Sequence, residues 1–280
     1  MSWIEKKWNI FTPSENWGLV REISDASSVE FGSSDSTISI YSAVDKKVSQ
    51  FPLRPVELAT SQLKQKNYFI KAYSVLGFTD STYLGLAVDS RARLLEFDSK
   101  GDSISSFGKN ENFSSRNDLD LFNLAQINMG WFGANDKKTH FAIASIFTNR
   151  IEIFDRKNKS IKTIYVAPKE HTKFDLIPEA NGYTVHWDLS SPYYFRDIVL
   201  TDTHVFALYG GFSEQQIQSN AVIAKTVYVY SLAGDFVAKF NLDTSITSIA
   251  VDQNLSKMYG ISTDEDPGIV EFDLPKFLED

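Results

Sequence analysis

The sequence predicts an all-β fold: a β-propeller of four-stranded blades that occupies all 280 residues as a single domain. Three observations lead to this prediction. Short segments alternate apolar and polar residues, a strand-and-turn pattern recurs along the chain, and apolar residues at helical spacing are nearly absent. A four-stranded sheet cannot bury its faces alone, whereas radial stacking of such sheets buries them and leaves only short edges. A two-sheet sandwich is the alternative, but it does not require the same pattern to recur five times.

Alternation with a period of two residues is the first of these observations. Residues 37–42 (TISIYS) place Ile38 and Ile40 on one face of a strand and polar or aromatic residues on the other. Similar runs, rich in β-branched and aromatic residues, occupy 151–155, 226–231 and 269–274. Two further segments, 60–68 and 213–224, fit a turn or two of helix as well as they fit a loop.

The second observation is the repetition of a whole strand-and-turn unit. Five copies, at a period of roughly 45 to 55 residues, start near residues 28, 73, 123, 195 and 245. The last copy ends after its third strand, near residue 274. Residues 3–11 are a strand candidate that would complete this blade and close the ring, and a loose tail is the alternative. The sequence therefore predicts five or six blades.

Composition excludes several function classes. The formal net charge of −8 disfavours nucleic-acid binding, which needs a basic surface. The absence of cysteine removes thiol catalysis and thiolate metal sites. No segment approaches the roughly 18 apolar residues of a membrane-spanning helix, and the first residues lack the apolar core of a signal peptide. We expect a soluble chain with no transmembrane segment. Its compartment and oligomeric state stay open.

A search for catalytic motifs finds no phosphate-binding loop, no nucleophile elbow and no histidine pair at metal-ligand spacing. We therefore assign no catalytic residue, no metal ligand and no cofactor. Residues 264–268 (DEDPG) could bind calcium through oxygen atoms, although acidic residues around a Pro-Gly pair are also typical of an ordinary loop. Residues 117–120 (NDLD) raise the same two alternatives.

The densest group of aromatic and polar residues in the chain is the candidate ligand-binding site. Its members are His186, Trp187, Asp188, Tyr193, Tyr194 and Arg196. We expect His186 and Asp188 to lie on one face of a strand. Aromatic rings that stack on a ligand, with polar groups that orient it, would form a carbohydrate or peptide platform. The alternative is a packing cluster between blades in which the arginine covers an aromatic face.

The stretch from residue 194 to residue 274 resembles the TolB-like six-bladed propeller family. The resemblance is carried by the strand Asp197–Thr201, the Ala-Gly-Asp hairpin within Tyr230–Phe240, and the run from Ser248 to Ile261. Residues 68–108 fit the same family, so that the resemblance covers about 28–274. It implies a bacterial propeller of a largely uncharacterised group, often lipoproteins of Gram-negative anaerobes. It also implies a periplasmic or outer-membrane location if a leader has been removed. No catalytic signature comes with the resemblance.

These observations predict a binding module rather than an enzyme. We expect it to recognise a protein or carbohydrate partner at one face of the propeller channel. The alternative is a propeller hydrolase or lyase that acts on sugars or lactones through channel carboxylates, with calcium as a candidate ligand. The fold does not separate the two, because propellers host both. The missing nucleophile motif, metal-ligand spacing and cofactor loop favour the binding module.

Overall fold

A computed structural model describes most of the chain from residue 26 onward. The described residues are 26–31, 37–52, 61–64, 71–167, 173–180, 182–254, 256–263 and 268–278. The candidate closing strand at 3–11 lies outside them, as do residues 264–267 of the calcium candidate. The chain divides into two compact units, Met1–Val88 with Leu94–Ser106 and Asp89–Arg93 with Phe107–Asp280. Each unit is described by itself, and the single domain stays a prediction.

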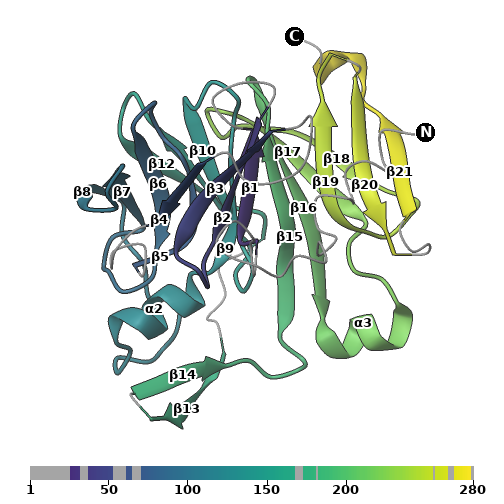
Figure 1. The fold of residues 1–280 in the computed structure, drawn as a ribbon. Helices are drawn as coiled ribbons and strands as arrows, with labels where there is room; N and C mark the ends of the chain where they lie inside the picture. Colours follow the sequence, from purple (N-terminus) through teal and green to yellow (C-terminus); the bar gives the residue numbers. More distant parts are fainter. Residues whose placement is uncertain are drawn as a thin grey trace, which may run out of the picture. The chain divides into compact units, whose positions relative to one another are not determined.

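The first unit contains two antiparallel sheets (Figure 1). One sheet consists of β1 (Ser28–Phe31), β2 (Thr37–Ser42), β3 (Lys47–Pro52) and β4 (Ser61–Lys64). The other consists of β5 (Ala72–Gly77), β6 (Thr82–Ala87), β7 (Leu94–Asp98) and β8 (Ser103–Phe107). Hydrogen bonds join β1 to β5: the Ser28 hydroxyl donates to the Val75 carbonyl over 2.7 Å, and Gly77 N–H donates to a Glu30 carboxylate oxygen over 2.6 Å.

The second unit contains three larger sheets, one hairpin and short helices. Its first sheet is β9 (Gly130–Ala134), β10 (His140–Ser145), β11 (Arg150–Asp155) and β12 (Ser160–Tyr165). Its second is β15 (Pro192–Leu200), β16 (His204–Ser213), β17 (Thr226–Ser231) and β18 (Phe236–Asn241). Its third is β19 (Ile246–Asp252), β20 (Lys257–Ser262) and β21 (Gly268–Asp273). The remaining elements are α2 (Leu121–Ile127), the hairpin β13 (Asp175–Glu179) with β14 (Gly182–His186), α3 (Glu214–Asn220) and the 3₁₀ turn η2 (Lys276–Leu278).

Strand β16 shows why these sheets stack face to face. Its side chains alternate between faces, as in any strand. Val205 and Ala207 pack into a core shared with β10, β11 and β15. Phe206 and Leu208 pack into a second core, shared with β17, β19 and β20. Both faces of the strand are therefore buried, each against a neighbouring sheet, as the propeller prediction requires.

The fold is a β-propeller with five visible blades, which confirms the predicted fold class. The structure adds two elements between the predicted strands. Residues 121–127 form α2, whose N-cap Asp120 accepts a hydrogen bond from Asn123 N–H over 2.7 Å. Because this helix occupies the predicted start of the third blade near 123, the first strand of that blade begins at Gly130. The hairpin β13–β14 is inserted between the third and fourth blades. Of the two ambiguous segments, 60–68 contributes β4 and 213–224 contains α3.

Gly130 is a position at which the sheet leaves no room for a side chain. A Cβ atom there would lie 2.7 Å from Ile143 Cγ2 and 2.8 Å from the Ala144 carbonyl oxygen. The carbonyl cannot move without separating β9 from β10. We expect Gly130→Ala to lower the free energy of unfolding by about 1–3 kcal/mol, measured by urea denaturation. Gly77→Ala is the control, because its Cβ would meet only the flexible Glu30 carboxylate, at 3.3 Å. Equal midpoints for the two variants would contradict this prediction.

Candidate functional site

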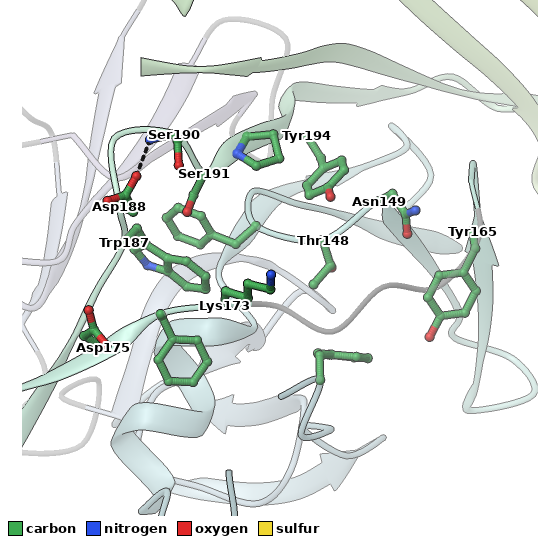
Figure 2. A pocket seen from close by; sticks show the side chains of 14 residues that line it. Thr148, Asn149, Tyr165, Lys173, Asp175, Trp187, Asp188, Ser190, Ser191 and Tyr194 are labelled. Carbon is green, nitrogen blue, oxygen red and sulfur yellow. Dashed lines mark hydrogen bonds between the residues drawn. The ribbon is translucent and has the colours of Figure 1, made fainter. Parts of the chain in front are cut away.

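The second unit contains a pocket with a volume of about 550 Å³ (Figure 2). Three segments far apart in the sequence form it. They are the turn between β10 and β11, the residues that lead into β13, and the residues that connect β14 to β15. Phe113, which lies between β8 and α2, and Tyr165 at the end of β12 complete the wall. The pocket therefore exists only because the hairpin insertion folds back beside the third blade.

Four aromatic rings and one arginine form a continuous row beside this pocket, which we call the aromatic ladder. Phe174 lies 5.3 Å from Trp187, and Trp187 stacks on Phe147 with ring centroids 3.9 Å apart and an interplanar angle of 10°. Phe147 lies 5.6 Å from Tyr193, and the Arg196 guanidinium lies 4.5 Å above the Tyr193 ring. The ladder attaches the hairpin segment to the third and fourth blades.

Helix α2 holds the hairpin through two amide side chains. Asn123 donates to the Tyr183 carbonyl oxygen over 2.7 Å. Gln126 donates to the Thr184 hydroxyl over 2.9 Å and accepts from Val185 N–H over 3.0 Å. Backbone groups on one edge of β14 are thus paired with side chains instead of a third strand. This attachment fixes the end of β14, and with it the position of Trp187.

Several polar residues line the same pocket. Asp188 accepts a hydrogen bond from Ser190 N–H over 2.7 Å, and bonds from Ser190 hold the pKa of Asp188 below its usual value. The Thr148 hydroxyl is buried and has no hydrogen-bond partner among the described residues. Asn149 is also buried, while Lys173 and Asp175 line the pocket and are exposed. A buried hydroxyl without a partner is costly unless a ligand or water pairs with it.

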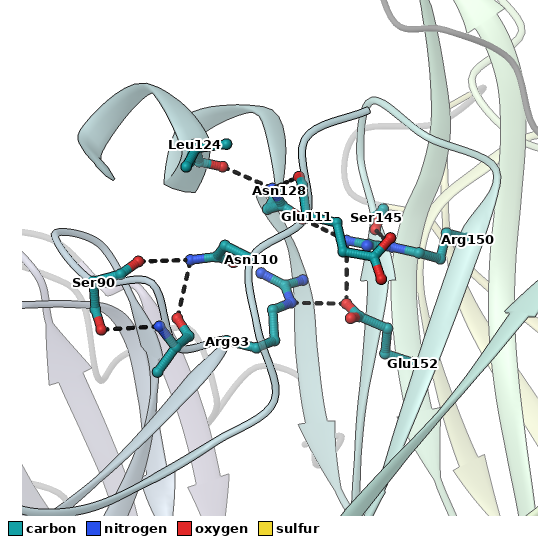
Figure 3. A network of polar contacts seen from close by, with 10 residues as sticks. Ser90, Arg93, Asn110, Glu111, Leu124, Asn128, Ser145, Arg150 and Glu152 are labelled. Carbon is teal, nitrogen blue, oxygen red and sulfur yellow. Dashed lines mark hydrogen bonds and ion pairs between the residues drawn. The ribbon is translucent and has the colours of Figure 1, made fainter. Parts of the chain in front are cut away.

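A buried ionic network joins Arg93, Glu152 and Arg150 (Figure 3). Glu152 accepts from Arg93 Nε over 2.7 Å and lies 3.2 Å from Arg150 Nη2. All three side chains are at most 5% exposed. Arg150 also donates to Asn128 Oδ1 over 2.8 Å, and its guanidinium carbon lies 4.1 Å above the Phe113 ring. The network therefore supports one wall of the pocket from behind.

The structure places the predicted site residues in two groups. Trp187, Asp188 and Tyr194 line the pocket, and Tyr193 and Arg196 belong to the aromatic ladder beside it. His186 is exposed and does not line the pocket. The expectation that His186 and Asp188 share a strand face is wrong, because β14 ends at His186 and Asp188 lies in the following turn.

Sequence reasoning missed Phe147, Thr148 and Phe174. Phe147 and Thr148 lie between β10 and β11, and Phe174 precedes a hairpin that the sequence does not predict. Because they are separated from Trp187 by 13 to 40 residues in the sequence, nothing local links them to it. An aromatic residue followed by two polar ones in the 147–149 turn was the one visible signal.

The other candidates from the sequence have structural roles where they are described. Asp118 pairs with Arg116 at 2.6 Å, and Asp120 caps α2. Across the described residues, no group of three or more histidine, aspartate or glutamate side chains could hold a metal ion. Within the same residues, no helix is long and apolar enough to cross a membrane.

Comparison with known proteins adds a family and a fold. The family model described as TolB-like 6-blade propeller-like matches residues 26–254. A chain of the solved structure titled "Crystal Structure of Mitotic Checkpoint Complex" is similar at a TM-score of 0.50 and 9% identity, over 89% of this chain and 61% of that chain. BamB from Moraxella catarrhalis is similar at a TM-score of 0.38 and 13% identity, over 84% of this chain and 69% of BamB. No curated protein matches. At 9% identity the first likeness shows the fold alone.

Proposed function

Because the chain belongs to the TolB-like 6-blade propeller-like family, we propose that it is a binding module of that fold whose pocket recognises a carbohydrate. One observation carries the proposal. The Trp187 ring and several polar side chains line a single pocket, and one of them, Thr148, has a buried hydroxyl without a hydrogen-bond partner among the described residues. Small-molecule sites typically combine apolar and aromatic walls with a few such polar groups.

The kind of polar group favours a carbohydrate over a peptide. The polar residues that line the pocket carry hydroxyls, amides and carboxylates, among them Thr148, Asn149, Asp188 and Ser191. Each can donate to or accept from a sugar hydroxyl. An extended peptide is usually recognised by the backbone of an open strand edge, with pockets for alternate side chains. The α2 amides already occupy groups on one edge of β14.

Charge favours a neutral or amino sugar over an acidic one. The pocket wall carries two carboxylates, Asp175 and Asp188, and one ammonium group, Lys173. Because its pKa is lowered, Asp188 stays ionised at neutral pH. An anionic ligand would meet this local excess of negative charge together with the net charge of −8.

A hydrolase or lyase is the second candidate, and the same two carboxylates favour it. Asp175 and Asp188 line one pocket, and glycoside hydrolysis commonly uses a pair of such groups. An enzyme would consume the saccharide that a binding module only retains. Product analysis of any saccharide that binds therefore separates the two candidates.

Trp187→Ala should weaken saccharide binding at least about tenfold, or about 1.4 kcal/mol, because it removes an aromatic ring from the pocket wall and the ring on which Phe147 stacks. The ligand is first identified on an array of neutral, amino and acidic oligosaccharides. Its affinity is then measured by titration calorimetry. Phe236→Ala is the control, since this ring on β18 is 61% exposed and does not line the pocket.

Thr148→Val tests the same site without deleting volume. Because the hydroxyl has no partner, this variant should be at least as stable as the wild type but should bind the saccharide more weakly. An array without a bound saccharide, or a Trp187→Ala variant with wild-type affinity, would refute the carbohydrate proposal. Accumulating cleavage products would instead establish the enzyme.

A further inference from the structure

The β13–β14 hairpin has two chemically different faces. The register pairs Leu176 with Val185 and Pro178 with Tyr183, so that these four side chains lie on one face. The next pair on this face in the same register is Phe174 and Trp187, whose rings are 5.3 Å apart. The other face carries Asp175, Ile177, Glu179, Thr184 and His186. We call the first of these the apolar face; none of its six members is charged.

The apolar face is continuous with the pocket. Phe174 and Trp187, at its base, also line the pocket wall. Leu176 and Val185 in the middle are half-buried, and Tyr183 near the tip is 53% exposed. Tyr183 and Trp187 are four positions apart on one extended segment, which separates their Cα atoms by about 13 Å. The face thus presents one ring in the pocket and a second ring well beyond it.

The hairpin is held in place at both ends of this face. At the base, Trp187 stacks on Phe147. Toward the tip, Asn123 and Gln126 of α2 bond to Tyr183, Thr184 and Val185. Figure 1 shows α2 beside β14. A two-stranded hairpin is marginally stable by itself, and these contacts give it a fixed position. A ligand along this face would meet a pre-organised surface.

We infer that the ligand is a linear saccharide chain, which leaves the pocket along the apolar face and stacks on Tyr183. This inference rests on the proposed function and deepens it, because it names the class of carbohydrate as a polymer rather than a single terminal sugar. The Trp187 and Tyr183 rings lie on the same face of the hairpin, so that one extended saccharide chain can contact both. A ligand confined to the pocket would reach Trp187 and leave Tyr183 unused.

The test compares short and long saccharides on matched variants. The probes are disaccharides and hexasaccharides of the cello-, malto- and chito-oligosaccharide series, measured by titration calorimetry. The wild type should bind one hexasaccharide about fivefold to tenfold more tightly than its disaccharide, as expected for one further stacking contact. Tyr183→Ala should remove this gain and leave disaccharide affinity unchanged. Ile177→Ala, on the opposite face and 42% exposed, is the control and should retain the gain.

The outcomes separate this inference from the proposed function. Equal affinity for short and long chains, or a Tyr183→Ala variant that keeps the gain, would overturn the inference. If Trp187→Ala still weakened binding in that case, the carbohydrate pocket would stand. If Trp187→Ala had no effect on either length, the proposed function would fail and the inference with it. Denaturation curves of both hairpin variants show whether each remains folded.

Discussion

Glu152→Ala is expected to lower the free energy of unfolding by about 3–5 kcal/mol, because it removes the carboxylate that pairs with two buried arginines. Arg93 and Arg150 are 2% and 1% exposed, and both contact the same Glu152 carboxylate oxygen. Because the site is enclosed, water cannot stabilise the two guanidinium charges as well as this carboxylate does. Burial already lowers the pKa of Arg150, and the Glu152 charge opposes this shift.

The measurement is urea denaturation of the wild type and the variant at neutral pH. Glu271→Ala is the matched control, because this glutamate also lies on the third strand of a blade and pairs with a basic residue, Lys257, at 2.7 Å. Its side chain is half exposed, so its loss should leave the midpoint near the wild-type value. A midpoint for Glu152→Ala as high as that for Glu271→Ala would show that the network contributes no stability.

The same substitution should also affect the pocket. Arg150 lies over the Phe113 ring, and Phe113 forms part of the pocket wall. If Arg150 moves when Glu152 is removed, Phe113 loses its support. We therefore expect Glu152→Ala to weaken saccharide binding under conditions in which the variant is still folded.

Asp197→Asn is expected to change how stability depends on pH. Burial raises the pKa of Asp197 to about 6, although hydrogen bonds from Ile249 N–H (2.9 Å) and Ile198 N–H (2.8 Å) lower it in part. Between pH 4 and 6 the folded protein therefore binds one proton that the unfolded chain does not. This carboxyl stabilises the fold at low pH, and its contribution falls by about 2 kcal/mol as pH rises through that window. Asparagine does not titrate, so the stability of the variant relative to the wild type should rise by about 2 kcal/mol between pH 4 and pH 7.

Asp188→Asn is the control, with the opposite sign. The lowered pKa of Asp188 means that its contribution is present at neutral pH and is lost as pH falls. As pH rises, the stability of Asp188→Asn relative to the wild type should fall, whereas the stability of Asp197→Asn relative to the wild type should rise. Denaturation by urea at pH 4, 5, 6 and 7 gives both curves. A difference between Asp197→Asn and the wild type that is independent of pH would refute the prediction.

The candidate site was predicted only in part from the sequence. Trp187, Tyr193 and Arg196 are near one another in the chain, and the structure does bring them into one ladder. The pocket itself needs Phe147, Thr148 and Phe174, which only the return of the hairpin places beside them. The ion pairs between Arg93, Glu152 and Arg150 could not be predicted from the sequence either, because Arg93 and Glu152 are 59 residues apart.

Local physics explains what the sequence determined by itself. Alternation in segments such as 37–42 and 226–231 sets which side chains can face a core, and the recurring turns set where each strand ends. A repeated sheet with two apolar faces then requires neighbours, so the propeller follows. The tertiary structure alone decided which residues meet at the pocket. Contacts such as Trp187 on Phe147 depend on how an inserted hairpin returns to the blades, and no periodicity encodes that return.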